Sequence, residues 1–157
     1  MREILFRGKN FTNGEWEYGV PVFTGLNNEL AFMKQMCSHD YQIIPETVGQ
    51  YTGLTDKNGK KIFEGDIVKD SSDPSAHLLC DNGKKKRRCI GVVKFGMHEV
   101  PSDDPFSWGD AYGFYIEGDT IYPTIATYKP CGRHGQFEIE VIGNIHDNPE
   151  LLKGGAE

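Results

Sequence analysis

Glycine and proline interrupt this chain about once every six residues, because nineteen Gly and eight Pro are spread over 157 positions. That spacing is too short for helices of ordinary length, but it suits short strands that are joined by turns. Hydrophobic residues make up 38% of the chain, and the aromatic residues are spread over most of its length, which argues against wholesale disorder. The sequence therefore predicts a folded, mainly β protein.

Two hairpins are the clearest local elements. In the first, residues 12–14 form a turn, and apolar residues alternate with other residues over positions 16–22, as in a strand with one buried face. In the second, the sequence DKNG at 56–59 closes a tight turn before Ile62 and Phe63. Residues 29–37 fit either a strand or a helix, because the spacing of their apolar residues agrees with the two-residue repeat of a strand and also with the 3.6-residue repeat of a helix.

Further along the chain, short strands alternate with loops. The segments Gly65 to Val68 and Gly91 to Phe95 form a pair of strands that is common in small SH3-like barrels. Residues 97–112 read as a long acidic and aromatic loop. We expect single helical turns at 45–48 and 148–152.

These elements predict one domain, because no change of composition marks a linker. We expect an N-terminal β-hairpin region over about residues 1–60, an SH3-like barrel with long inserted loops over 61–152, and a frayed tail at 153–157. Helices are limited to a few short turns.

Charge and hydropathy restrict where the protein acts. The net charge of −6 would repel a polyanion at long range. There is no apolar run of about eighteen residues, and the N-terminal sequence MREILFRG turns polar too early for a signal peptide. Four scattered cysteines are too few for a disulfide scaffold, so we expect reduced thiols in the cytoplasm and no contact with a membrane.

Six segments of the chain, in this order, together resemble the YopX family of bacteriophage and prophage proteins. They are REILFR at 2–7, GEWEYG at 14–19, PETVGQYTGL at 45–54, DKNG at 56–59, IFEGDIV at 62–68 and VIGNIHDNPELL at 141–152. The resemblance implies an all-β fold with an SH3-like barrel, encoded by a phage or prophage and expressed in a bacterial host. It implies no activity and no cofactor, and residues 70–137 match none of its motifs.

The densest charge run lies in that unmatched stretch. It consists of Lys84, Lys85, Lys86, Arg87 and Arg88. Five adjacent cations can grip a phosphate backbone or an acidic protein surface. However, the run follows the turn sequence Asp81-Asn82-Gly83, so a solvated hairpin tip is the simpler interpretation.

Cysteine and histidine residues in the same stretch raise the question of a structural zinc ion. The candidate ligands are His77, Cys80, Cys89, Cys131 and His134. Thiolates and imidazoles are the ligands that Zn²⁺ prefers, but neither half of this set has the paired Cys-x-x-Cys spacing of a zinc knuckle. Small, partly buried thiols are the alternative, and we predict no metal.

The acidic residues Asp103, Asp104 and Asp110 lie around Trp108, where they could line a ligand groove or simply be solvated. An aromatic strip for peptide binding is a further hypothesis, with core packing as the alternative. Its members are Trp16, Tyr18, Phe63, Phe95, Phe114 and Tyr115. No nucleophile elbow, phosphate-binding glycine loop or His-Glu-x-x-His motif is present, so we predict no enzymatic activity.

These observations favour a noncatalytic binding or accessory protein whose mid-chain region contacts a phage or host macromolecule. One alternative is a nucleic-acid-binding accessory protein that uses Lys84 to Arg88. Another is a structural or assembly protein that forms a homo-oligomer through exposed sheet edges.

Overall fold

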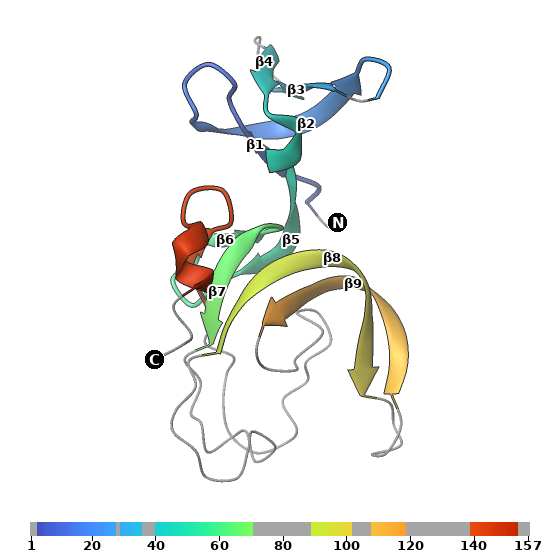
Figure 1. Ribbon diagram of the computed structural model, residues 1–157, viewed down its shortest axis with the longest axis vertical. Helices are drawn as coiled ribbons and strands as arrows, with labels where there is room; N and C mark the ends of the chain where they lie inside the picture. Colours follow the sequence, from blue (N-terminus) through green and yellow to red (C-terminus); the bar gives the residue numbers. More distant parts are fainter. Residues whose placement is uncertain are drawn as a thin grey trace. The chain divides into compact units, whose positions relative to one another are not determined.

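The computed structural model describes residues 3–27, 29–35, 40–70, 89–101, 108–118 and 139–153. Within these ranges the chain forms strands and two short 3-10 helices, which confirms the prediction of a mainly β fold (Figure 1). None of the helices in these ranges is long and apolar enough to cross a membrane. The contacts divide the chain into two compact units, of which unit 1 comprises Met1–Leu54 with Lys61–Glu64 and unit 2 comprises Thr55–Lys60 with Gly65–Glu157. The expectation of one domain stays a prediction.

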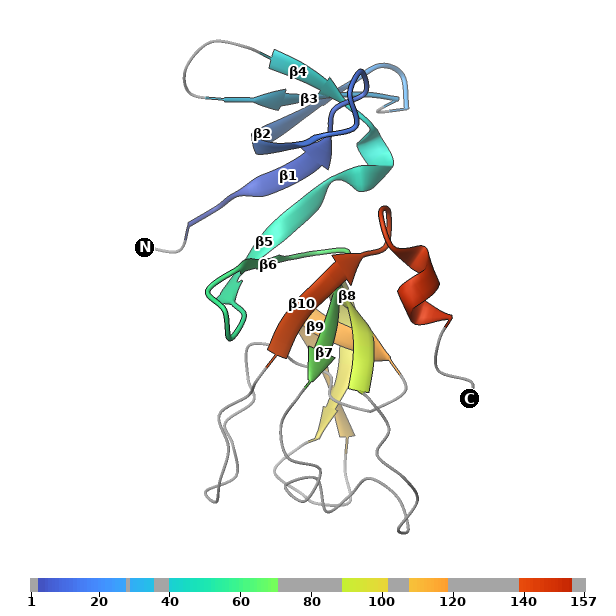
Figure 2. The same cartoon turned by 90° about the vertical axis from the view of Figure 1, so that its left-hand side faces the viewer.

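Unit 1 is built on a six-stranded antiparallel sheet, whose strand order is β4-β3-β2-β1-β5-β6 (Figure 2). The strands are β1 (Phe6–Lys9), β2 (Trp16–Thr24), β3 (Leu30–Lys34), β4 (Asp40–Ile43), β5 (Gly49–Thr55) and β6 (Lys61–Phe63). Within residues 29–37, which fitted a strand or a helix, Leu30–Lys34 is a strand, because β3 pairs with β2 on one side and with β4 on the other.

The core of unit 1 lies on one face of this sheet. Ala31, Met33 and Ile43 are almost completely buried there, and the partly buried Phe6 and Val48 pack against them. Alternate residues of a strand point to opposite faces, so this arrangement leaves Leu30 and Phe32 of β3 on the other face. The predicted helical turn is present as the 3-10 helix Pro45–Thr47, between β4 and β5.

Unit 2 contains a four-stranded antiparallel sheet in the order β10-β7-β8-β9. The strands are β7 (Asp66–Asp70), β8 (Cys89–Pro101), β9 (Trp108–Gly118) and β10 (Ile139–Asn144), and the 3-10 helix Pro149–Leu152 follows. The sheet is strongly curved, as the bent course of β8 and β9 shows (Figure 1). Ile67, Val68, Val93, Phe114 and Val141 are buried in this unit. Such a core is consistent with an SH3-like barrel, which stays a prediction.

The pairing of β8 changes along its length. It pairs with β7 only from Cys89 to Val92, whereas its pairing with β9 runs from Gly91 to Pro101. Beyond Val92, the described part of the sheet is therefore a two-stranded ribbon. The expectation of a loop over residues 97–112 is wrong at both ends, because 97–101 belong to β8 and 108–112 belong to β9. Phe95 and Met97 alternate along β8, and Tyr112 and Phe114 alternate along β9, but the acidic and proline residues between them favour a loop.

Candidate binding surfaces

The register of the ribbon places successive residue pairs on one face. Phe95 lies opposite Phe114, Met97 lies opposite Tyr112, and Glu99 lies opposite Asp110. Because side chains alternate between the faces of a strand, all six belong to the face that carries the buried Val93. The face therefore begins in the core of unit 2 and continues along the ribbon.

Exposure rises along this face. Phe114 is buried, whereas the exposed fractions of Phe95, Met97 and Tyr112 are 42%, 66% and 70%. We call these three exposed side chains the ribbon row. The ring of Phe95 contacts Phe114 at a centroid distance of 4.8 Å and meets Tyr112 edge to face at 5.0 Å. These contacts hold the aromatic members of the row against the core, which favours a defined surface over a mobile one.

On the opposite face of the ribbon, polar and aromatic side chains pair with one another. His98 stacks on Tyr115 at a centroid distance of 4.8 Å. Lys94 forms an ion pair with Glu117, and the hydrogen bond from Lys94 to this carboxylate raises the pKa of the lysine. The two faces thus differ in chemistry, and the large exposed apolar side chains belong to the ribbon row.

In unit 1, the guanidinium group of Arg7 lies between two aromatic rings. Its central carbon is 4.4 Å from the centroid of the Trp16 ring and 4.8 Å from that of Phe63. Tyr18 and Tyr51 in turn contact Phe63 at centroid distances of 5.8 and 5.5 Å. Arg7 is only 6% exposed, so this cation–π cluster stabilises unit 1 and offers little surface to a ligand.

Strand β2 carries a second exposed apolar row. Tyr18, Val20 and Val22 lie on one face of the strand, and all three are exposed. We call them the β2 row. Val20 pairs with Lys34, whose ammonium group is 3.6 Å from the carboxylate of Asp40. The β2 row therefore has charges of both signs beside it.

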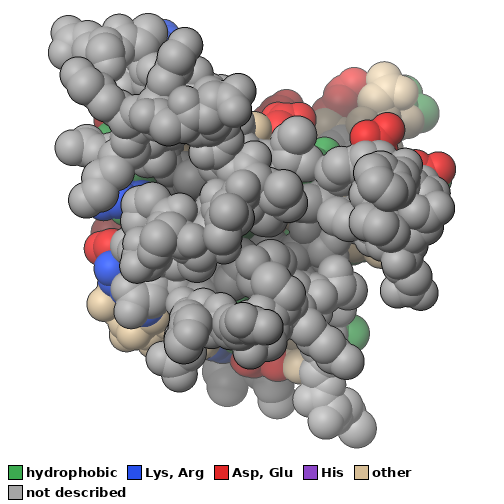
Figure 3. All heavy atoms as spheres, turned by 90° about the horizontal axis from the view of Figure 1, so that it is seen from below, with side chains coloured by type: hydrophobic (Ala, Val, Ile, Leu, Met, Phe, Trp, Pro, Cys, Tyr) green, Lys and Arg blue, Asp and Glu red, His purple; other side chains and the backbone are tan. Residues whose placement is uncertain are grey.

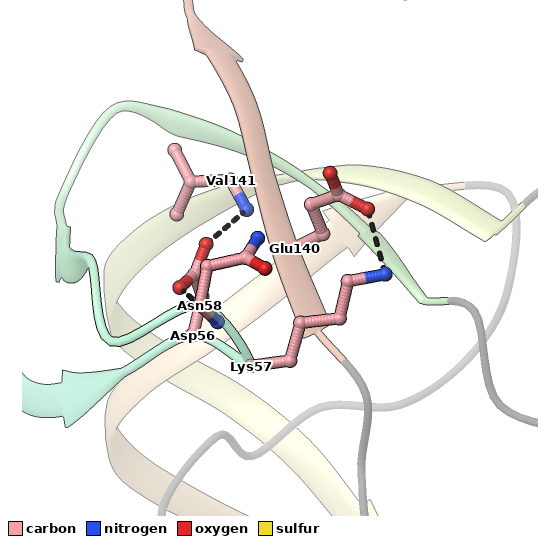
Figure 4. Close-up of polar contacts among 5 residues, drawn as sticks. All are labelled: Asp56, Lys57, Asn58, Glu140 and Val141. Atoms are coloured by element: carbon pink, nitrogen blue, oxygen red, sulfur yellow. Dashed lines mark hydrogen bonds and ion pairs between the residues drawn. The ribbon is translucent and has the colours of Figure 1, made fainter.

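The turn between β5 and β6 is organised by one carboxylate (Figure 4). Oδ1 of Asp56 accepts hydrogen bonds from the backbone N–H groups of Asn58 at 2.8 Å and Lys60 at 2.9 Å. Its Oδ2 accepts a third from the N–H of Val141 in β10, at 3.1 Å. The neighbouring Lys57 forms an ion pair with Glu140 at 2.8 Å, so the turn is fastened to β10 within unit 2.

These donors determine how Asp56 titrates. Burial alone would raise the pKa of the carboxyl group, but the N–H groups of Val141, Lys60 and Asn58, together with the charge of Lys60, lower it below its ordinary value. Both carboxylate oxygens accept backbone hydrogen bonds, as is typical of an aspartate that shapes a turn.

The segment after β10 is organised in a similar way by Asn144. Its Oδ1 accepts the backbone N–H groups of His146 and Asp147, each at 2.9 Å, and its Nδ2 donates to the carboxylate of Asp147 at 2.7 Å. Asp147 therefore helps to hold the turn at residues 144–147. The organising residue is Asn144, which sequence reasoning missed.

Most of the residues that the sequence singled out lie outside the described ranges. These are Lys84 to Arg88, His77, Cys80, Asp103, Asp104, Cys131 and His134. Of Cys89 and Trp108, only the backbone is described, and it begins β8 opposite Asp70 and β9 opposite Pro101. Within the described residues, no three His, Cys, Asp or Glu side chains come together as metal ligands would.

The six aromatic residues of the predicted strip divide between the units. Trp16, Tyr18 and Phe63 belong to unit 1, whereas Phe95, Phe114 and Tyr115 belong to unit 2. Trp16 and Phe63 contact Arg7, and Tyr18 contacts Phe63. Phe114 is buried in the core of unit 2. The sequence does not predict the ribbon row, because Met97 and Tyr112 lie within the stretch 97–112 that reads as a loop.

Figure 3 views the protein from below. Among the described side chains in this view, basic and acidic residues both occur, and along one edge they are neighbours. The described part of this face therefore presents no extended basic field of the kind that binds a polyanion without sequence preference.

Comparison with known proteins identifies relatives over nearly the whole chain. A family model with the description "YopX protein" matches residues 6–153. The crystal structure of protein EF1440 from Enterococcus faecalis is similar at 24% sequence identity, with 97% of this chain and 99% of that chain covered and a TM-score of 0.43. No curated protein matches the chain.

Proposed function

We propose, from the premise that this chain belongs to the YopX family, that it is a noncatalytic protein that binds another macromolecule. The observation that carries this proposal is the ribbon row. Phe95, Met97 and Tyr112 expose between 42% and 70% of their surface on one face of one ribbon. Neighbouring large apolar side chains that remain in water are typical of interaction sites.

The polar groups of the described residues support the same proposal. The carboxylate of Asp56 is occupied by three backbone donors, and that of Asp147 is occupied by Asn144. A general acid or base needs a carboxyl group or imidazole that faces a substrate site, and the lowered pKa of Asp56 makes its carboxylate a weaker base. These two carboxylates are therefore better suited to holding the scaffold together.

The setting of this activity follows from the family motifs of the sequence. They imply a phage or prophage origin, so we place the protein and its partner in the cytoplasm of the bacterial host. A macromolecular partner fits the ribbon row, because its exposed side chains follow one another along two paired strands.

Affinity capture from the native host during prophage induction tests the proposal. The recovered material is analysed by mass spectrometry for proteins and by sequencing for nucleic acids. We expect a macromolecule in near-stoichiometric yield that is absent from a capture with an unrelated bait. Catalytic turnover that disappears on replacement of a single titratable residue would overturn the noncatalytic assignment, whichever partner is recovered.

A further inference from the structure

We infer that the ribbon row and the carboxylates beside it form one docking surface for an extended, basic and apolar segment of a protein partner. The carboxylates are those of Glu99 and Asp110, which we call the acidic pair. This inference rests on the proposed function, because it identifies the surface and the chemistry of the partner that a binding protein of this shape would recognise.

The spacing of the surface suits an extended segment. Met97 and Tyr112 lie opposite each other, and Glu99 and Asp110 form the next pair on the same face. Two residues along a strand correspond to about 7 Å. A partner in extended conformation repeats its side chains at the same distance, so an apolar residue over Met97 and Tyr112 places the residue two positions away over the acidic pair.

The acidic pair supplies the charge preference. Both carboxylates are exposed and lie directly opposite each other on adjacent strands. Like charges in that position repel each other and weaken the pairing of the strands. On the other face of the ribbon, Glu117 is paired with Lys94, whereas the group facing Glu99 across the strands is another carboxylate. A Lys or Arg of the partner would relieve this repulsion.

The same charges disfavour the other occupants of an apolar face. A nucleic acid would bring phosphates towards two carboxylates of a protein whose net charge is already −6. A symmetric dimer through this face would bring two acidic pairs onto one apolar surface. A basic protein segment combines apolar contact with charge complementarity, and it is therefore the occupant that the surface fits.

Fluorescence anisotropy with two labelled peptides tests this inference on the full chain. In both peptides a charged residue stands two positions after each Leu or Val, with Ser between them, so that the apolar and charged side chains share one face of the extended peptide. The charged residue is Lys in one peptide and Glu in the other. We expect the Lys peptide to bind at least about tenfold more tightly, and we expect added salt to weaken its binding. The substitutions Glu99→Gln and Asp110→Asn should each weaken it about threefold.

The apolar contribution is tested with Met97→Ser/Tyr112→Ser, which should weaken binding of the Lys peptide by about tenfold or more. Both positions are exposed, so the fold should be retained, and circular dichroism checks this. Glu117→Gln is the charge-matched control on the opposite face. Val20→Ser/Val22→Ser is the matched apolar control in the β2 row. Both controls should bind like the wild type.

Three results would overturn the inference. They are no binding of the Lys peptide, equal binding of the two peptides, and unchanged binding after loss of either the acidic pair or the two ribbon-row side chains. The proposed function is judged separately by capture from the native host. A macromolecule recovered there by a protein that fails with the peptides would retain the function and reject this surface.

Discussion

The carboxylate of Asp56, in the turn between β5 and β6, accepts a hydrogen bond from the backbone N–H of Val141 in β10, at 3.1 Å and across 85 positions of the sequence. The same side chain accepts the N–H groups of Asn58 and Lys60, which shape the turn itself. The backbone of Lys57 adds a hydrogen bond to the carbonyl of Ile139 at 3.0 Å. One residue thus forms the turn and also fastens it to β10.

Replacing Asp56 with Asn should lower the free energy of unfolding by about 1–3 kcal/mol. The substitution keeps the shape of the side chain but turns one acceptor oxygen into an NH₂ group, which then faces a backbone N–H. Urea-induced unfolding measures the loss. Asp40→Asn is the control, because Asp40 and its partner Lys34 are more than half exposed and such pairs contribute about 0.5 kcal/mol or less. Equal effects of the two substitutions would reject the assigned role of Asp56.

The lowered pKa of Asp56 also predicts how stability depends on pH. A carboxyl group whose pKa is lower in the folded state stabilises the fold above its unfolded value, near 3.8, and this contribution is lost as the pH falls through the folded value. The stability difference between wild type and Asp56→Asn should therefore be constant near neutral pH and shrink in acid. Unfolding curves between about pH 7 and pH 2 test this. A difference that does not change over that range would contradict it.

Substitution of Arg7 by Lys should destabilise the protein although the charge is kept. The flat guanidinium group lies between the rings of Trp16 and Phe63, and a lysine ammonium cannot stack on two rings at once. We expect a loss of about 1–2 kcal/mol in the free energy of unfolding. Lys34→Arg, at an exposed position of β3, is the reverse exchange and should have almost no effect. An equally stable Arg7→Lys protein would show that stacking contributes little.

Glycine at position 118 allows β9 to approach β8 closely. A Cβ atom at Gly118 would lie 2.6 Å from the backbone carbonyl oxygen of Ile90, whereas one at Gly113 in the same strand would meet nothing within 4 Å. Gly118→Ala should therefore lower the melting temperature and cost about 1–3 kcal/mol. Gly113→Ala should be neutral or stabilising, because it restricts the unfolded chain. Thermal unfolding measures the melting temperatures of the two variants side by side. Similar melting temperatures would contradict the prediction that Gly118 is needed for the close approach of the strands.

Sequence patterns predicted much of this fold because they act locally. The alternation in β2, the Asp-x-Asn-Gly turn and the proline at the start of each 3-10 helix all specify structure over a few residues. Family motifs also mark structural residues, since Arg7, Trp16 and Phe63 of the cation–π cluster and Asp56 of the turn all lie in them.

The candidate surface was harder to predict because it depends on pairing between distant strands. That Met97 lies opposite Tyr112, and Glu99 opposite Asp110, follows from the register of β8 and β9, which composition does not fix. The contact between Asp56 and Val141 is similarly invisible in a local pattern. The acidic and proline residues between the two strands favoured a loop and concealed the alternation that continues on both sides.

The nucleic-acid hypothesis makes its own prediction about Lys84 to Arg88. Replacing all five cations with Ser or Gln should weaken binding to oligonucleotides and flatten its dependence on salt concentration, because fewer counterions are released. Filter binding over a range of salt concentrations measures both effects. If binding is unchanged, these residues are not a nucleic-acid site.

Light scattering shows whether the protein forms the homo-oligomer that the structural or assembly hypothesis predicts.

The most direct test of the account is a parallel capture from the native host with three baits, which are the wild type, Met97→Ser/Tyr112→Ser and Val20→Ser/Val22→Ser. Each double variant replaces two exposed apolar side chains, one pair in the ribbon row and the other in the β2 row. We predict that the wild type and the β2-row variant recover the same macromolecule in equal yield, while the ribbon-row variant recovers little of it. Undiminished recovery by the ribbon-row variant would contradict the account.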